Sequence, residues 1–117
     1  MMKIYSYPQC GTCKKALAWL KANQIEFETI HIVDQPPSQK ELKKGLSLSE
    51  KPINKFFNTS GQVYRQGNYK EKLKTMTEAA AIKELASHGK LIKRPLVISD
   101  EYCLVGFREE EWASALL

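Results

Sequence analysis

The spacing of apolar residues changes twice along the first third of the chain. Residues 3–7, KIYSY, have the composition of a strand, and residues 26–33, EFETIHIV, are again rich in β-branched and aromatic side chains. Between them, in residues 10–24, apolar residues recur at helical spacing on one face. These positions are Cys13, Ala16, Leu17 and Leu20. A strand, a helix and a strand in this order predict a βαβ unit with parallel strands.

The middle of the chain is predicted to be mostly helical. Two prolines at 36–37 stop the second strand, and Ser38 with Glu41 forms a capping-box pattern at the start of a helix. The predicted helices cover 39–47, 51–58 with Pro52 in its first turn, 69–76, and 77–89, which Thr77 or a neighbour caps and Gly89 ends. The polar segment 59–68 contains two glycines and is predicted to be a loop.

The last part of the chain completes the fold. Residues 94–99 and 102–107 predict two short strands joined by a turn at Asp100 and Glu101, and 108–117 predict a final helix with acidic residues in its first turn. This order is that of the thioredoxin-like α/β fold, with a mixed four-stranded sheet and a helical insert. We predict one domain over 1–117. Its core covers about 1–33 and 90–117, and its insert about 34–89.

Composition narrows the class of protein. A chain of 117 residues with 43% hydrophobic residues can bury one core without disulfides. The first residues lack a signal-peptide pattern, and no 18 consecutive residues are apolar, so a cytoplasmic protein without membrane attachment is expected. The net charge of +5 weakly favours an acidic partner or an anionic substrate. The lysines fall on polar helix faces without interleaved aromatic residues, so direct nucleic-acid binding is not expected.

Two cysteines, Cys10 and Cys13, lie where the first strand passes into the first helix. Unpaired N–H groups at a helix start stabilise a thiolate, and such a position can lower a cysteine pKa to about 3.5–7.5. Cys10 is therefore the candidate nucleophile. The N–H groups of Gly11 and Thr12 would face it, Gly11 lets a ligand approach closely, and Lys14 can hold an anion or simply be solvated.

The other candidate ligands and thiols have different expected roles. Cys13 belongs to the apolar stripe, so it should be more buried and slower, either a resolving cysteine or a small core residue. Cys103 lies in an alternating strand and is predicted to be core. His31 and His88 lack metal-ligand spacing to the cysteines, so no metal site is expected.

Three segments, YPQCGTCKKALAWL, IHIVDQPPSQKEL and IKRPLVISDEYCLVGFREEE, resemble in order and spacing the glutaredoxin-linked arsenate reductase (ArsC) and Spx family. The resemblance implies a thioredoxin-like fold with a helical insert. It also implies that Cys10 is the nucleophile, that Cys10 and Cys13 can form a redox-switch pair, and that Arg94 binds an oxyanion before a cis-proline, Pro95.

The chain departs from the arsenate reductases at two further arginine positions. Asn58 and Gly106 stand where that family has arginines around the bound anion. Arg65 and Arg108 are near enough in sequence to compensate. The sequence also departs from the Spx proteins, because Ser60 stands where one of their arginines is expected.

Three functions remain open at this level. The first is a cytosolic thiol-dependent oxidoreductase with no bound cofactor, served by a small thiol or a thiol reductant protein, with glutathione and glutaredoxin or thioredoxin as electron donor. The second is an Spx-like regulator that binds the C-terminal domain of the RNA polymerase α-subunit. The third is arsenate reduction, for which weak or undetectable activity is expected. A monomer is expected in each case.

Overall fold

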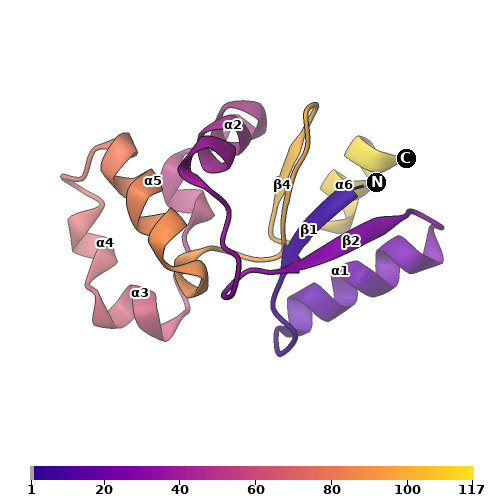
Figure 1. The fold of residues 1–117 in the computed structure, drawn as a ribbon, viewed down its shortest axis with the longest axis horizontal. Coiled ribbons are helices and arrows are strands. Elements are labelled where there is room, and N and C mark those ends of the chain that lie inside the picture. Colours follow the sequence, from indigo (N-terminus) through magenta and orange to yellow (C-terminus); the bar gives the residue numbers. More distant parts are fainter. Residues whose placement is uncertain (1) are drawn as a thin grey trace.

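A mixed four-stranded sheet forms the centre of the fold (Figure 1). The computed structural model describes residues 2–117. The strands, in the order β2-β1-β3-β4, are β1 (Met2–Ser6), β2 (Phe27–His31), β3 (Leu96–Ile98) and β4 (Cys103–Val105). β1 pairs in parallel with β2 and antiparallel with β3, and β3 pairs antiparallel with β4. The predicted α/β class and thioredoxin-like sheet are therefore confirmed.

Two helices belong to the sheet unit, and the others lie between β2 and β3 in the chain. The former are α1 (Gly11–Ala22) and α6 (Glu109–Leu116). The latter are α2 (Gln39–Ser49), the 3₁₀ turn η1 (Ile53–Phe56), α3 (Gln62–Gln66), α4 (Tyr69–Lys72), α5 (Glu78–Ser87) and the 3₁₀ turn η2 (Gly89–Leu91). In Figure 1, α3, α4 and α5 gather at one end of the long axis, away from α1 and β2. No helix within residues 2–117 is both long and apolar enough to cross a membrane.

The strands divide the core into two clusters because successive side chains point to opposite faces of a sheet. Ile4 and Val97, which are paired across β1 and β3, pack with Ala16, Leu20 and Trp112 of α1 and α6. Their strand neighbours Tyr5 and Leu96 belong to the second cluster, which includes the insert residues Leu42, Phe56 and Leu85. The sheet is thus covered by α1 and α6 on one face and by the insert on the other.

Local signals set the helix ends that the sequence predicts. Ser38 and Thr77 accept hydrogen bonds at 3.1 Å from the N–H groups of Glu41 and Ala80, as expected for N-caps. α5 ends at Ser87, however, and Gly89 begins the following 3₁₀ turn. A Cβ at Gly89 would lie 2.0 Å from the Ile32 carbonyl oxygen, so this glycine permits a close backbone contact in addition to following a helix.

Three predicted boundaries in the insert are wrong. The segment 59–68, predicted to be a loop, contains α3, which has no fully buried side chain and therefore a weak apolar signal. The helix predicted over 51–58 is only one 3₁₀ turn, and Pro52 precedes it as N-cap. The helix predicted over 69–76 ends at Lys72. Each segment is too short to display a helical period.

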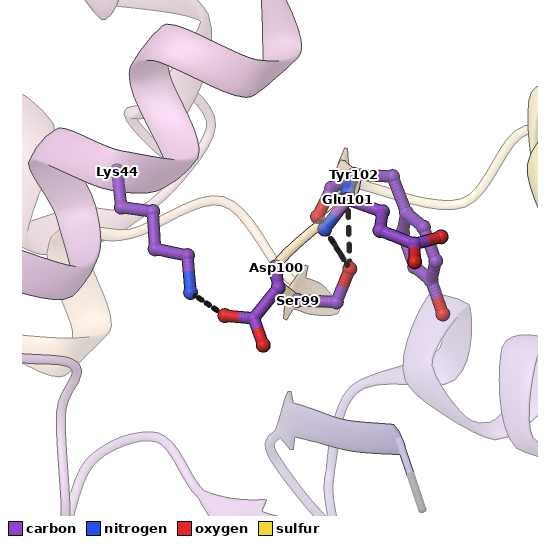
Figure 2. A network of polar contacts seen from close by, with 5 residues as sticks. All are labelled: Lys44, Ser99, Asp100, Glu101 and Tyr102. Atoms are coloured by element: carbon purple, nitrogen blue, oxygen red, sulfur yellow. Dashed lines mark hydrogen bonds and ion pairs between the residues drawn. The ribbon is translucent and has the colours of Figure 1, made fainter.

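The β3–β4 hairpin is joined to the insert at its turn. Figure 2 shows the Ser99 hydroxyl oxygen accepting from the backbone N–H groups of Glu101 and Tyr102, at 3.1 and 3.0 Å, which closes the predicted two-residue turn. Lys44 of α2 reaches across to form an ion pair with Asp100. Because the Asp100 side chain is 93% exposed, this pair contributes little to stability.

Candidate active site

Cys10 is the N-cap residue of α1. Its backbone is extended, with φ −85° and ψ 117°, and its N–H donates to the Tyr7 carbonyl at 3.0 Å. Its carbonyl accepts the first helical hydrogen bond from Lys14 at 3.1 Å, and its sulfur accepts the N–H of Cys13 at 3.3 Å. The thiol therefore occupies the place of a capping oxygen, where a negative charge is stabilised by unpaired N–H groups.

The surroundings of Cys10 favour the thiolate. Partial burial by itself raises the pKa of Cys10, but the thiol and N–H of Cys13, the Arg94 guanidinium and the N–H of Thr12 together outweigh burial. The net result is a Cys10 pKa below its ordinary value. A larger fraction of this thiol is consequently reactive at neutral pH.

Cys13 and Cys103 differ from Cys10, because both are buried thiols that stay protonated at neutral pH. Cys13 is 1% exposed, and burial raises its pKa to about 12. Burial also raises the pKa of Cys103 to about 12, with Lys51 offsetting only part of the effect. Cys103 lies on the insert face of the sheet, where its sulfur is 3.0 Å from a Cβ built on Gly45. All three cysteines are free thiols.

Arg94 lies beside this thiol at the start of β3. The Arg94–Pro95 peptide bond is cis, the geometry implied by the family resemblance. The guanidinium carbon lies 5.0 Å from the centre of the Tyr7 ring, within the range of a cation–π contact, and one guanidinium N–H reaches the Lys90 carbonyl at 3.4 Å. The Nε atom is buried without a hydrogen-bond partner. The influence of Arg94 on Cys10 is therefore that of its positive charge.

A cleft of about 700 Å³ lies in front of Cys10. Three groups of residues line it: Cys10, Thr12, Lys93 and Arg94 from the start of α1 and the segment before β3; Glu50, Lys51, Pro52, Lys55, Asn58, Ser60 and Gly61 from the insert; and Val105, Gly106, Phe107, Arg108 and Glu111 from the end of β4 onward. Among residues 2–117, no three His, Cys, Asp or Glu side chains are grouped so as to hold a metal ion.

The structure brings together only part of the predicted site. Cys10, Thr12 and Arg94 line the cleft, whereas Gly11 and Lys14 are exposed and are not among its lining residues. Lys14 is therefore solvated, which is the second of the two roles expected for it. Pro95 and Cys13 are buried and are not among the lining residues of the cleft.

The two positions at which the arsenate reductases have an arginine and this chain does not both line the cleft. Asn58 and Gly106 line it, and so does Arg108, whose guanidinium lies 3.7 Å from the Glu111 carboxylate. Arg65 does not line it, and its guanidinium donates instead to the Ser60 carbonyl at 3.0 Å. The expectation that Arg65 compensates for a missing arginine therefore finds no support in this geometry.

Sequence reasoning misses the lysines of the cleft. Lys51, Lys55 and Lys93 line it, although no motif in the sequence marks them. Lys93 directly precedes the Arg94–Pro95 pair, and this adjacency is the signal that could have found it. Lys51 and Lys55 come from the insert, and nothing in their local sequence indicates that the insert folds over the thiol.

The chain matches the model of the ArsC family over residues 5–115. This match covers nearly the whole sequence, and the chain belongs to the ArsC family. It is 49% identical to a protein of Bacillus subtilis, YusI, over 95% of this chain and 94% of that one. It is 33% identical to the regulatory protein MgsR and 30% identical to the global transcriptional regulator Spx of the same organism, over 94% and 95% of this chain and 86% and 83% of theirs.

Solved structures agree with this membership. An ArsC family related protein from Bacteroides fragilis superposes with a TM-score of 0.94 at 49% identity, over 97% of this chain and 95% of that one. A possible arsenate reductase from Streptococcus mutans UA159 superposes with a TM-score of 0.88 at 37% identity, over 97% of this chain and 98% of that one. The recognised family and the fold therefore rest on both sequence and structure.

Proposed function

We propose that this protein is a cytosolic thiol–disulfide oxidoreductase in which Cys10 is the nucleophile and Cys13 is the resolving cysteine. One observation carries the proposal. The Cys10 sulfur caps α1 at the cleft, while Cys13, which donates its N–H to that sulfur, is buried behind it. The accessible thiol is thereby the one with the lowered pKa, and a second thiol lies within one helical turn.

The reaction exchanges one disulfide for another. The Cys10 thiolate attacks a sulfur of the substrate disulfide, so that a Cys10–sulfur bond forms and the other sulfur departs as a thiolate. The departing thiolate takes the proton of Cys13, whose sulfur then attacks Cys10 and releases the second half of the substrate. The substrate gains two electrons, which the two cysteines lose.

Return to the dithiol requires an external reductant. A small thiol or a thiol reductant protein would supply it, with glutathione and glutaredoxin or thioredoxin as the candidate donors, and no bound cofactor is required. Arg94 stabilises the Cys10 thiolate and, because it also lines the cleft, its guanidinium orients an anionic substrate or donor.

The test follows the products by intact mass. Reduced protein mixed with hydroxyethyl disulfide should lose two hydrogens, and dithiothreitol should restore them. Cys10→Ser should stop the reaction, and Cys13→Ser should accumulate a mixed disulfide on Cys10. Cys103→Ala is the matched control and should behave as the wild type. Formation of an internal disulfide in Cys10→Ser would contradict the proposal.

A redox-switched regulator is the second candidate, and the similarity to MgsR and Spx favours it. In this case the Cys10–Cys13 disulfide would change affinity for the C-terminal domain of the RNA polymerase α-subunit. Binding of the reduced and oxidised protein to that purified domain distinguishes the candidates. Affinity that depends on the disulfide would make the regulator the preferred function.

Arsenate reduction is the third candidate, and the possible arsenate reductase from S. mutans favours it. We expect weak activity, because Asn58 and Gly106 cannot replace two charged donors, each worth about 1.5–3 kcal/mol. Activity with glutathione and glutaredoxin should fall further in Arg94→Ala. A kcat/KM for arsenate above about 10⁴ M⁻¹s⁻¹ would show that Arg108 compensates and would make this candidate the function.

A further inference from the structure

Lys93 lies directly over Gly106. A Cβ built on Gly106 would be 2.9 Å from the Lys93 Cε atom and 3.7 Å from its ammonium nitrogen. The lysine stem therefore occupies the space into which a side chain at position 106 would project. Position 106 is also one of the two at which the family resemblance leads one to expect an arginine that this chain lacks.

The backbone around Gly106 fixes this arrangement. Its φ is +71°, a conformation that side-chain-bearing residues rarely adopt. Its N–H donates to the Pro95 carbonyl at 2.9 Å, and its carbonyl accepts the buried indole N–H of Trp112 at 3.0 Å. Both backbone polar groups of Gly106 are therefore hydrogen-bonded. Because glycine has no side chain, the Lys93 stem can pack against its Cα atom.

The cleft has an excess of positive charge. Its lining contains five cationic side chains and two carboxylates. Glu111 is already engaged by Lys51 at 3.1 Å and lies 3.7 Å from Arg108. Within residues 2–117, Lys93 has no carboxylate within ion-pair distance, and it directly precedes Arg94 in the lining of the cleft that also contains Cys10.

The volume of the cleft indicates the size of ligand that it can bind. About 700 Å³ is within the range of pockets that enclose drug-sized molecules. A bare tetrahedral oxyanion would leave most of this space to water. A molecule of two or three amino-acid residues would extend from Cys10 toward the insert wall formed by Lys55, Asn58 and Ser60.

We propose that Lys93 is an anion-binding residue of this cleft and that the cleft takes a peptide-sized thiol or disulfide whose carboxylate lies against Lys93 while its sulfur lies at Cys10. The proposal rests on the oxidoreductase function and names the substrate class. The exchange is the one given above, in which the Cys10 thiolate forms a bond to one substrate sulfur and the other leaves as a thiolate that is later protonated.

The test compares two chromogenic disulfides. Dithiobis(nitrobenzoate) carries two carboxylates, and 4,4′-dithiodipyridine is uncharged at neutral pH. Lys93→Met, which keeps the length of the stem, should lower the ratio of their rates with Cys10 by about three- to tenfold, and Lys93→Arg should retain it. Lys21→Met is the matched control, because Lys21 is exposed near the end of α1 and does not line the cleft.

A second experiment tests whether the cleft binds a peptide-sized molecule. A tripeptide that cannot exchange, S-methylglutathione, should slow the reaction of the wild type with dithiobis(nitrobenzoate) and should do so less in Lys93→Met. Equal protection by inorganic sulfate would overturn the assignment of a peptide-sized substrate.

The outcomes separate the two proposals. An unchanged rate ratio in Lys93→Met, with Cys10 still reactive toward both reagents, would overturn the role of Lys93 and leave the oxidoreductase standing. If Cys10 of the wild type reacted with neither disulfide faster than the same thiol does in the urea-unfolded chain, the oxidoreductase function itself would be wrong.

Discussion

Selective alkylation of Cys10 tests the chemistry of the site most directly. With a pKa of about 12, only about 10⁻⁵ of the Cys13 thiol is ionised at pH 7, against a few per cent of an unperturbed thiol. The higher nucleophilicity of a more basic thiolate recovers about 1.5 orders of magnitude. Cys10 has a pKa below the ordinary value, so iodoacetamide should modify it at least about 100-fold faster than Cys13 or Cys103.

The pH dependence of that rate identifies the cause. The rate at Cys10 should rise with pH and level off above the Cys10 pKa, at a midpoint below the value of about 8.5 for an unperturbed thiol. Arg94→Met should move this midpoint upward, because the positive guanidinium stabilises the thiolate. Arg65→Met is the matched control, since Arg65 lies outside the cleft.

Peptide mapping by mass spectrometry after timed alkylation gives all three rates in one experiment. Two results would refute the reasoning. One is modification of Cys13 or Cys103 as fast as Cys10 in the folded protein. The other is a midpoint for Cys10 at or above the value of an unperturbed thiol, since helix capping and Arg94 would then have no measurable effect.

Three further predictions concern stability. Gly106→Ala places a side chain at φ +71° and should cost about 1–2 kcal/mol, seen as a melting temperature lower by about 3–8 °C; an unchanged value would contradict the backbone argument. Trp112→Phe leaves the Gly106 carbonyl without its buried donor and should cost about 1–3 kcal/mol in urea denaturation, unlike a merely space-filling residue. Cys13 and Cys103 stay protonated in the folded protein to about pH 12 but ionise above about pH 8.5 when the chain is unfolded. The free energy of unfolding should therefore fall as the pH rises from about 9 to 12. This decrease with pH should be smaller in Cys103→Ala, which removes one of the two thiols.

Segments that bury a regular apolar face or carry a clear turn signal are predictable from the sequence, and segments without either are not. The βαβ unit, the hairpin and α6 follow from apolar spacing and turn residues, because each buries a regular face against the sheet. The helix α3 has only five residues, and its Val63 and Tyr64 are half-buried, so its pattern resembles that of a polar loop.

The candidate site is predictable in its chemistry but not in its extent. Cys10 and Arg94 can be found because a helix start and an Arg-Pro pair are local signals. Lys55 and Asn58 depend on how the insert folds back toward the thiol, which no local pattern determines. Lys14 looks suitable by sequence distance alone, yet it faces solvent, since consecutive helical residues point in different directions.

The two walls of the cleft belong to different hydrophobic clusters. The thiol is carried by α1, which packs with α6 on one face of the sheet, whereas residues 50–61 belong to the insert that covers the other face. Residues 56–58 are nevertheless tied to residues 91–93, beside Arg94, by backbone hydrogen bonds and the Phe57–Ile92 bridge, and Phe56 and Phe57 are buried in the core. Exchange of exposed cleft residues of the insert, such as Lys55 and Ser60, should therefore alter recognition while the nucleophile keeps its reactivity, whereas replacement of Phe56 or Phe57 should disturb both.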